Sequence, residues 1–214
     1  MITGHRGTET QSSFLKRAFL CVSVSLWLVA VSVTSAHAQD WIEFQDKAER
    51  FGVNLPGKPE VTNITYATWR GAMLPAKVYT VKVGPRSYSV TVVNYASLAA
   101  KSDGDTTDIL GSIAWAAWNV RKRRGVQINY DAYAQADRIE GHEIYLVNPD
   151  KSQTRVGIFL HAKRLYILEA NVPAGSPPPL QFQQSLEIFD DQGVRVRYDI
   201  DADLNRTRTK DTCQ

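Results

Sequence analysis

Four β-type segments follow one another at short spacing in the second half of the chain, and this series sets the fold class. Each segment alternates apolar and polar residues or concentrates β-branched and aromatic ones, as strands do. Strands that are joined by such short turns run antiparallel. The segments are residues 126–133, 138–147, 154–161 and 164–171, with turns at 148–151 and 162–163.

The first half of the same domain also predicts strands. A short strand over Phe51–Leu55 ends at a Pro-Gly pair, and residues 61–69 are rich in β-branched and aromatic residues. Residues 76–83 and 87–93 alternate around a Gly-Pro-Arg turn, which predicts a hairpin.

One helix is expected between these two groups of strands. Asp103 and Asp105 offer N-capping side chains, and cations at 121–124 followed by Gly125 are typical of a helix end. At 100° per residue one apolar stripe results, made of Ile109, Ile113, Ala116, Ala117 and Val120.

A second helix is predicted over residues 180–189, where Phe182, Leu186 and Phe189 recur at helical spacing after a proline run. A last strand is expected at 194–198, and the polar end should be loose. The order of elements predicts an α+β fold with an antiparallel β-sheet flanked by helices. We expect one domain over residues 39–200 and a polar tail over 201–214.

Residues 1–38 have the three parts of a secretory signal peptide. Lys16 and Arg17 precede an apolar run over 18–33, and small residues surround a cleavage site after Ala38. The run is shorter than the roughly 20 residues of a spanning helix, so cleavage is favoured over an uncleaved anchor. We therefore expect an exported protein, periplasmic in a Gram-negative source and secreted in a Gram-positive one.

Removal of this signal changes what composition implies. The precursor has 25 Lys and Arg against 22 Asp and Glu, whereas the part after residue 38 has 22 against 21, a net charge of +1. This near-neutral charge gives no support for an overall electrostatic attraction to nucleic acid. Cys213 is the one cysteine left, so an intramolecular disulfide is excluded and the core must provide the stability.

Four short segments carry a resemblance to a known family: residues 51–59 (FGVNLPGKP), 141–144 (GHEI), 163–166 (KRLY) and 182–188 (FQQSLEI). They resemble the PsbP-like proteins, a superfamily of α/β/α sandwiches that includes the Mog-type Ran-binding proteins. The resemblance covers about residues 51–189 and implies a central antiparallel sheet with helices on its faces. It also implies a binding or assembly role without catalysis, and it transfers no catalytic residue or metal ligand.

The sequence holds little that indicates catalysis or cofactor binding. It has neither a Gly-x-Ser-x-Gly elbow nor a phosphate-binding loop. The acidic run at 199–205 is similar to a calcium loop, but Leu204 replaces the required glycine and Lys210 the bidentate glutamate. We therefore expect no metal and no cofactor.

One polar group remains as a candidate enzyme site. In a strand, Glu140 and His142 would share a face, and a cross-strand approach to His161 would bring a third ligand or catalytic group. This group is the alternative on which a small hydrolase or metal-dependent enzyme would depend. The other interpretation of the same residues is a polar strand surface.

The first helix carries a more informative feature. Trp115 and Trp118 lie opposite its apolar stripe, with Lys122 one turn beyond Trp118 and Arg121 beside it. Either a second layer, for which the Trp41/Phe44 segment is a candidate, covers these indoles, or the four residues form a partner-binding surface. A protein interface is favoured for such a surface, and anionic lipid or glycan is the alternative.

The sequence thus predicts an exported, non-catalytic binding or accessory protein of the cell envelope. Its partner would be an envelope protein or a small ligand. No nucleic acid is expected, membrane contact has no specific support, and the sequence leaves the oligomeric state open.

Overall fold

The computed structural model describes Met1, residues 41–101 and residues 107–209. Apart from Met1, the predicted signal peptide lies outside this part of the chain, as do the capping residues Asp103 and Asp105 and the tail cysteine Cys213. All the described helices and strands belong to one compact unit, Asp40–Gln214.

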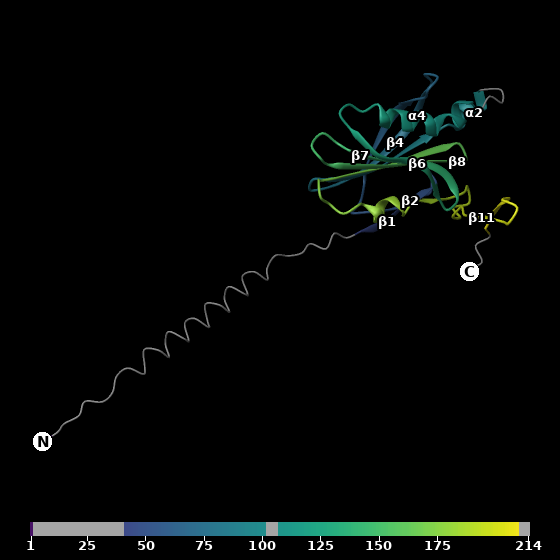
Figure 1. The fold of residues 1–214 in the computed structure, drawn as a ribbon. Coiled ribbons are helices and arrows are strands. Elements are labelled where there is room, and N and C mark those ends of the chain that lie inside the picture. The colour runs from purple at the N-terminus through teal and green to yellow at the C-terminus, as the bar shows by residue number, and fades with distance from the viewer. Residues whose placement is uncertain (2–40, 102–106, 210–214) are drawn as a thin grey trace. The chain divides into compact units, whose positions relative to one another are not determined.

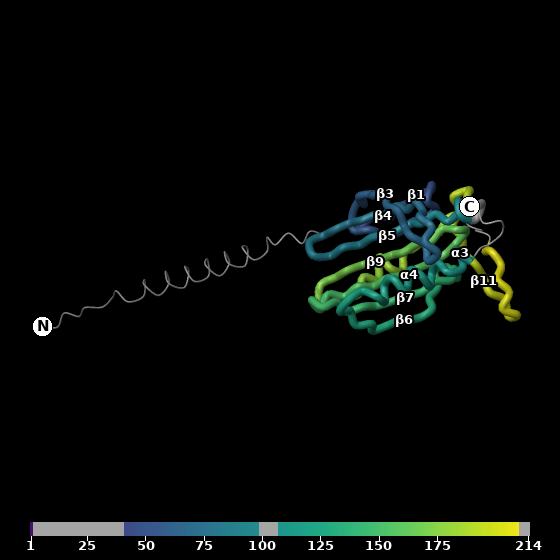
Figure 2. The backbone as a smooth tube through the Cα atoms, turned by 90° about the horizontal axis from the view of Figure 1, so that it is seen from above, coloured from purple at the N-terminus to yellow at the C-terminus, as the bar shows by residue number. Residues whose placement is uncertain are grey.

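A seven-stranded antiparallel sheet forms the centre of this unit (Figures 1 and 2). Its strand order is β3-β4-β5-β9-β8-β7-β6, so two meanders meet where β5 pairs with β9. The hairpin and the four later strands predicted from the sequence are confirmed. The strands are β3 (Glu60–Ala67), β4 (Met73–Val83), β5 (Arg86–Asn94), β6 (Gln127–Ala136), β7 (Ile139–Val147), β8 (Gln153–His161) and β9 (Arg164–Val172).

Three helices follow β5, and the longest of them packs on one face of the sheet. They are α2 (Ala96–Lys101), α3 (Thr107–Leu110) and α4 (Ser112–Arg121), and α4 contacts β7 and β8. The apolar residues of the predicted stripe do face the core, since Ile109, Ala116, Ala117 and Val120 are buried against strand residues such as Ile144. The single predicted helix is wrong, because Gly111 divides it into α3, which carries Ile109, and α4, which carries the others. Within the described ranges, no helix combines the length and apolar character that crossing a bilayer requires.

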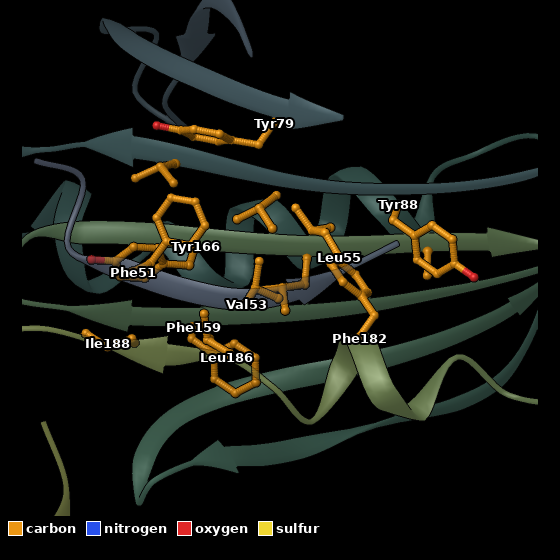
Figure 3. Close-up of a cluster of buried hydrophobic side chains, with 14 of the residues drawn as sticks. Phe51, Val53, Leu55, Tyr79, Tyr88, Phe159, Tyr166, Phe182, Leu186 and Ile188 are labelled. Carbon is orange, nitrogen blue, oxygen red and sulfur yellow. The ribbon is translucent and has the colours of Figure 1, made fainter. Parts of the chain in front are cut away.

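A smaller sheet covers the opposite face. It consists of β1 (Ile42–Asp46), β2 (Phe51–Leu55) and β10 (Glu187–Ile188), with the short helix α5 (Leu180–Gln183) beside it. Figure 3 shows their side chains meeting those of the large sheet, with Phe51 near Tyr166 and Phe182 near Tyr88. This second core is rich in aromatic rings, which bury large apolar areas.

The helix predicted over residues 180–189 is wrong beyond its first turn. Helix α5 ends at Gln183, and Ile188 instead pairs with Phe51 of β2. The amide of Phe189 then donates to the carbonyl of Arg50 at 2.9 Å. Pairing with an already buried strand satisfies these backbone groups and still buries Phe182 and Leu186, so tertiary context overrides the helical spacing.

The end of the chain also differs from its prediction. The last strands are β11 (Tyr198–Ile200) and β12 (Arg206–Arg208), which form a hairpin. The expected strand at 194–198 is therefore displaced toward the C-terminus, and the polar tail contains paired residues. The antiparallel α+β class holds, but helices flank mainly one face, because the small sheet covers most of the other.

Candidate functional site

The candidate site is built on the exposed side of α4. Trp115 and Trp118 stack with ring centroids 5.1 Å apart and an interplanar angle of 15°. The Trp115 indole Nε1 donates to the carbonyl oxygen of Ala67 at 2.8 Å, which ties the helix to the end of β3. Trp118 has no such anchor among the hydrogen bonds of the described residues, and 49% of it is exposed.

A third indole joins them from the loop between β3 and β4. In this loop, the amides of Gly71 and Ala72 donate to the backbone and side-chain oxygens of Thr68, which is buried. The loop presents Trp69 with 43% of its surface exposed. Sequence reasoning placed Trp69 at the end of a strand and missed this role, because only the sheet topology brings it to α4.

Gly111 explains how Trp69 reaches the helix. A Cβ atom at this position would lie 2.9 Å from the Trp69 Nε1 atom and 3.2 Å from its Cδ1 atom. Such distances are shorter than van der Waals contact, so any side chain would displace the indole. The absence of a side chain at the start of α4 therefore lets the loop and the helix form one surface.

We call this surface the tryptophan patch. It surrounds an open, apolar depression of about 450 Å³, whose lining residues are Trp69, Gly111, Ala114, Trp115 and Trp118. Two cations border it: the Lys122 Nζ atom lies 4.1 Å from the Trp118 ring centroid, and the Arg70 guanidinium carbon lies 5.0 Å from that of Trp69. Cations over indole faces are attracted by the ring quadrupole.

The cover that the sequence suggested for these indoles is not found on them. Trp41 and Phe44 belong to the opposite face of the large sheet, where Trp41 packs edge-on against Tyr88 and Phe44 lies against Phe51 and Tyr79. The large sheet thus separates the Trp41/Phe44 segment from the tryptophan patch.

Arg121, one of the four residues predicted for the partner-binding surface, forms an ion pair outside the tryptophan patch. Its Nε and Nη2 atoms donate to the two carboxylate oxygens of Asp131 at 2.6 and 2.7 Å. The guanidinium hydrogen bonds, with a smaller contribution from His142, lower the pKa of the Asp131 carboxyl to about 2. Lys122 is therefore the helix-end cation that borders the patch, and Arg121 fastens α4 to β6.

His142 belongs to this same ion-pair group. Its Nε2 atom contacts the Asp131 carboxylate and lies 3.0 Å from Arg121 Nη2. Glu140 lies two residues away on the same face of β7 and is exposed. A carboxylate and a guanidinium thus already engage the ring nitrogen that a catalytic or metal role at this surface would need.

His161 lies on the other face of the sheet. Its Nε2 atom is 3.2 Å from the Tyr198 hydroxyl, and Tyr198 packs beside the aromatic core. Burial, reinforced by Arg206, Arg208 and Arg50, lowers the pKa of His161. The structure therefore separates His142 from His161, and the polar group suggested by the sequence does not form one site.

Metal binding finds no support at the acidic run either. Asp201 accepts hydrogen bonds from the amides of Asp203 and Asn205 at 3.0 and 2.7 Å, so it shapes the turn between β11 and β12. Across residues 41–101 and 107–209, no group of three or more His, Cys, Asp or Glu side chains is arranged to hold a metal ion.

One of the solved structures to which this chain is similar comes from a cyanobacterium. It is the solution structure of cyanobacterial PsbP (CyanoP) from Synechocystis sp. PCC 6803, with 10% sequence identity, a TM-score of 0.45, and coverage of 72% of this chain and 96% of that one. No protein-family model matches this chain, and no curated protein does. Membership of the PsbP-like superfamily stays a prediction from the sequence.

Proposed function

We propose that this chain is an exported, non-catalytic binding module of the cell envelope, and that the tryptophan patch is its binding surface. The observation that carries the proposal is the exposure of Trp69 and Trp118 around one apolar depression. Export rests on the signal-like composition of residues 1–38.

The contact of these exposed indoles with water is unfavourable in free energy. Burying a large apolar side chain is worth about 1.5–3 kcal/mol, so a partner that covers the patch gains from each ring. Tryptophan is also the residue type most enriched among the energetic centres of protein interfaces. Trp115, which is hydrogen-bonded to Ala67, gives the surface a rigid base and lowers the entropic cost of binding.

The border of the patch indicates the charge of the partner. Lys122 lies over the rings of Trp115 and Trp118, while Asp108, the acidic residue of α3, is buried. An apolar segment that carries Asp or Glu beside its anchoring side chain would match both features. We therefore propose an acidic, apolar segment of another envelope protein as the ligand.

The alternative enzyme has weaker support. A hydrolase that used His142 would need a free ring nitrogen facing a substrate. Asp131 and Arg121 engage that nitrogen instead, and Arg121 forms a two-pronged ion pair with the carboxylate. The geometry fits a group that joins α4 to β6 and β7.

Selection from a random-peptide display library on the unit 40–214 tests the proposal. We expect enriched peptides to combine an aromatic or aliphatic anchor with Asp or Glu. Trp69→Ala and Trp118→Ala should each weaken their binding by at least about tenfold, as central interface residues do. Because each indole is nearly half exposed and belongs to neither buried cluster, the melting temperature should change little.

Tyr133→Ala is the matched control, since Tyr133 is an exposed aromatic residue on β6, outside the patch. It should leave binding of the selected peptides unchanged. Peptides that bind both tryptophan variants as tightly as the original chain would contradict the proposal. So would a large fall in melting temperature, which would assign the indoles to the core.

A further inference from the structure

The two edges of the large sheet differ in how they are protected. Strand β6 forms one edge, and its pairing with β7 is interrupted by a register shift between Ile128 and Tyr130. Irregularities of this kind twist an edge strand and discourage pairing with another chain. Strand β6 also bears Asp131 in its centre, where a charge hinders pairing.

Strand β3, at the other edge, lacks these devices. Its eight residues pair with β4 without any register shift, and its sequence, EVTNITYA, contains no proline and no lysine. Every residue of β3 except the half-buried Tyr66 is exposed, and Val61 and Ile64 are 50% and 39% exposed. Among the described residues, β4 is the one strand that pairs with it.

We propose that β3 is a dimerisation edge, which pairs antiparallel with β3 of a second copy of this chain. The two large sheets would then form one continuous sheet about a two-fold axis perpendicular to it. In such a pair each residue faces a residue on the same side of the sheet, as the side-chain alternation of strands requires. This inference concerns assembly and is independent of the tryptophan patch.

The charge distribution of β3 favours a second copy as the occupant. Glu60 is the only charged residue of β3 and lies at its first position. Antiparallel pairing puts the two Glu60 side chains at opposite ends of the joined strands, so no like charges face each other. The remaining positions are neutral and mostly β-branched, which suits cross-strand contact.

The side chains also match when the axis passes through Ile64. On the face that packs against α4, Ile64 would meet its own copy, and Thr62 would meet Tyr66. On the other face, Val61 would meet Ala67, and Asn63 would meet Thr65. Pairs of β-branched and aromatic residues are among the stabilising cross-strand contacts, and this register brings the exposed isoleucines together.

Sedimentation velocity of the unit 40–214, from micromolar to sub-millimolar concentration, tests this edge. We expect a monomer–dimer equilibrium. Ile64→Lys should raise the dissociation constant at least about tenfold, because it places like charges beside each other across the axis. Ile128→Lys is the matched control, since Ile128 is 41% exposed on the other edge strand and should leave the equilibrium unchanged.

Hydrogen exchange provides a second measurement on the unaltered chain. Amides within residues 60–67 should become more protected as concentration rises, and those of β6 should not. A monomer at all concentrations would overturn the proposal. A dimer that Ile64→Lys leaves intact, or that protects β6 in place of β3, would also overturn it.

Discussion

At the scale of single residues, one glycine allows the close packing of the aromatic core on the large sheet. Position 141, near the start of β7, is a glycine because a Cβ there would overlap the Phe159 ring and come within 2.5 Å of the carbonyl oxygen of Ile158. Phe159 thereby lies flat across the strand and completes the aromatic core. A glycine in a strand interior often marks this kind of close approach.

His161 shows the cost of a partly buried titratable group. Its Nδ1 atom is buried without a hydrogen-bond partner among the described residues, and its Nε2 atom meets the Tyr198 hydroxyl. Arg50, Arg206 and Arg208 raise the cost of protonation, and Asp190 offsets part of it. The neutral ring is therefore the form that the folded chain prefers.

This preference predicts a pH dependence of stability. Because the pKa of His161 is lower in the folded chain than its ordinary value of 6.5, the unfolded chain binds the proton more readily. The stability that the neutral His161 ring gives the folded chain is fully present above pH 6.5. It is lost as the pH falls from 6.5 through the lower pKa of the folded chain. The free energy of unfolding, measured with urea, should therefore fall more steeply between about pH 7 and pH 5 for the unaltered chain than for His161→Gln. Parallel profiles would contradict this assignment.

At the scale of elements, the C-terminal hairpin is attached to a finished core. Val196 is 1% exposed and belongs to the aromatic cluster, whereas β11 beyond Tyr198 and all of β12 contribute no member to either cluster. The hairpin is held by exposed contacts, including an ion pair between Arg208 and Asp190. Exposed ion pairs contribute little to stability.

Two truncations should therefore differ sharply. A chain that ends at Tyr198 keeps both clusters and should unfold at nearly the original urea concentration. A chain that ends at Arg195 also loses Val196 and Tyr198, which packs against the aromatic cluster, so its free energy of unfolding should fall by at least about 1.5–3 kcal/mol, the worth of one buried aliphatic side chain. Equal losses in the two truncated chains would show that the hairpin itself stabilises the fold.

The elements that the sequence predicts well are those with local signals. The buried stripe that includes Ala116 and Ala117 follows from helical spacing, and the strands from alternation and short turns. Strand β10 could not be predicted, because Ile188 is a strand residue only through its pairing with Phe51, far away in the sequence. Trp69 was missed for the same reason, since Gly111 receives it only in the folded chain.

Across the whole molecule, one sheet serves two cores. Strands β4, β5, β7, β8 and β9 each send alternate side chains to the α4 face and to the aromatic face. On β8, for example, Ile158 packs under α4 and Phe159 on the opposite side. Neither core can be lost without exposing the backbone of the sheet that the other requires.

Unfolding should therefore be a single cooperative transition. Trp41 reports on the aromatic face and the three indoles of the patch on the other, so single-tryptophan variants can follow each face separately. We expect their denaturant midpoints to coincide with each other and with that of far-ultraviolet circular dichroism. Two separated midpoints would show that the two cores unfold independently.

The stacking of Trp115 and Trp118 has an optical consequence. Two identical chromophores held with their centroids 5.1 Å apart exchange excitation energy, so their shared transitions split into a pair of bands whose signs record their relative orientation. The stacked pair is thus an intrinsic spectroscopic probe of the tryptophan patch. A ligand that rotates or separates the two rings would be visible in the circular dichroism spectrum of the unmodified protein, before anything is known about what that ligand is.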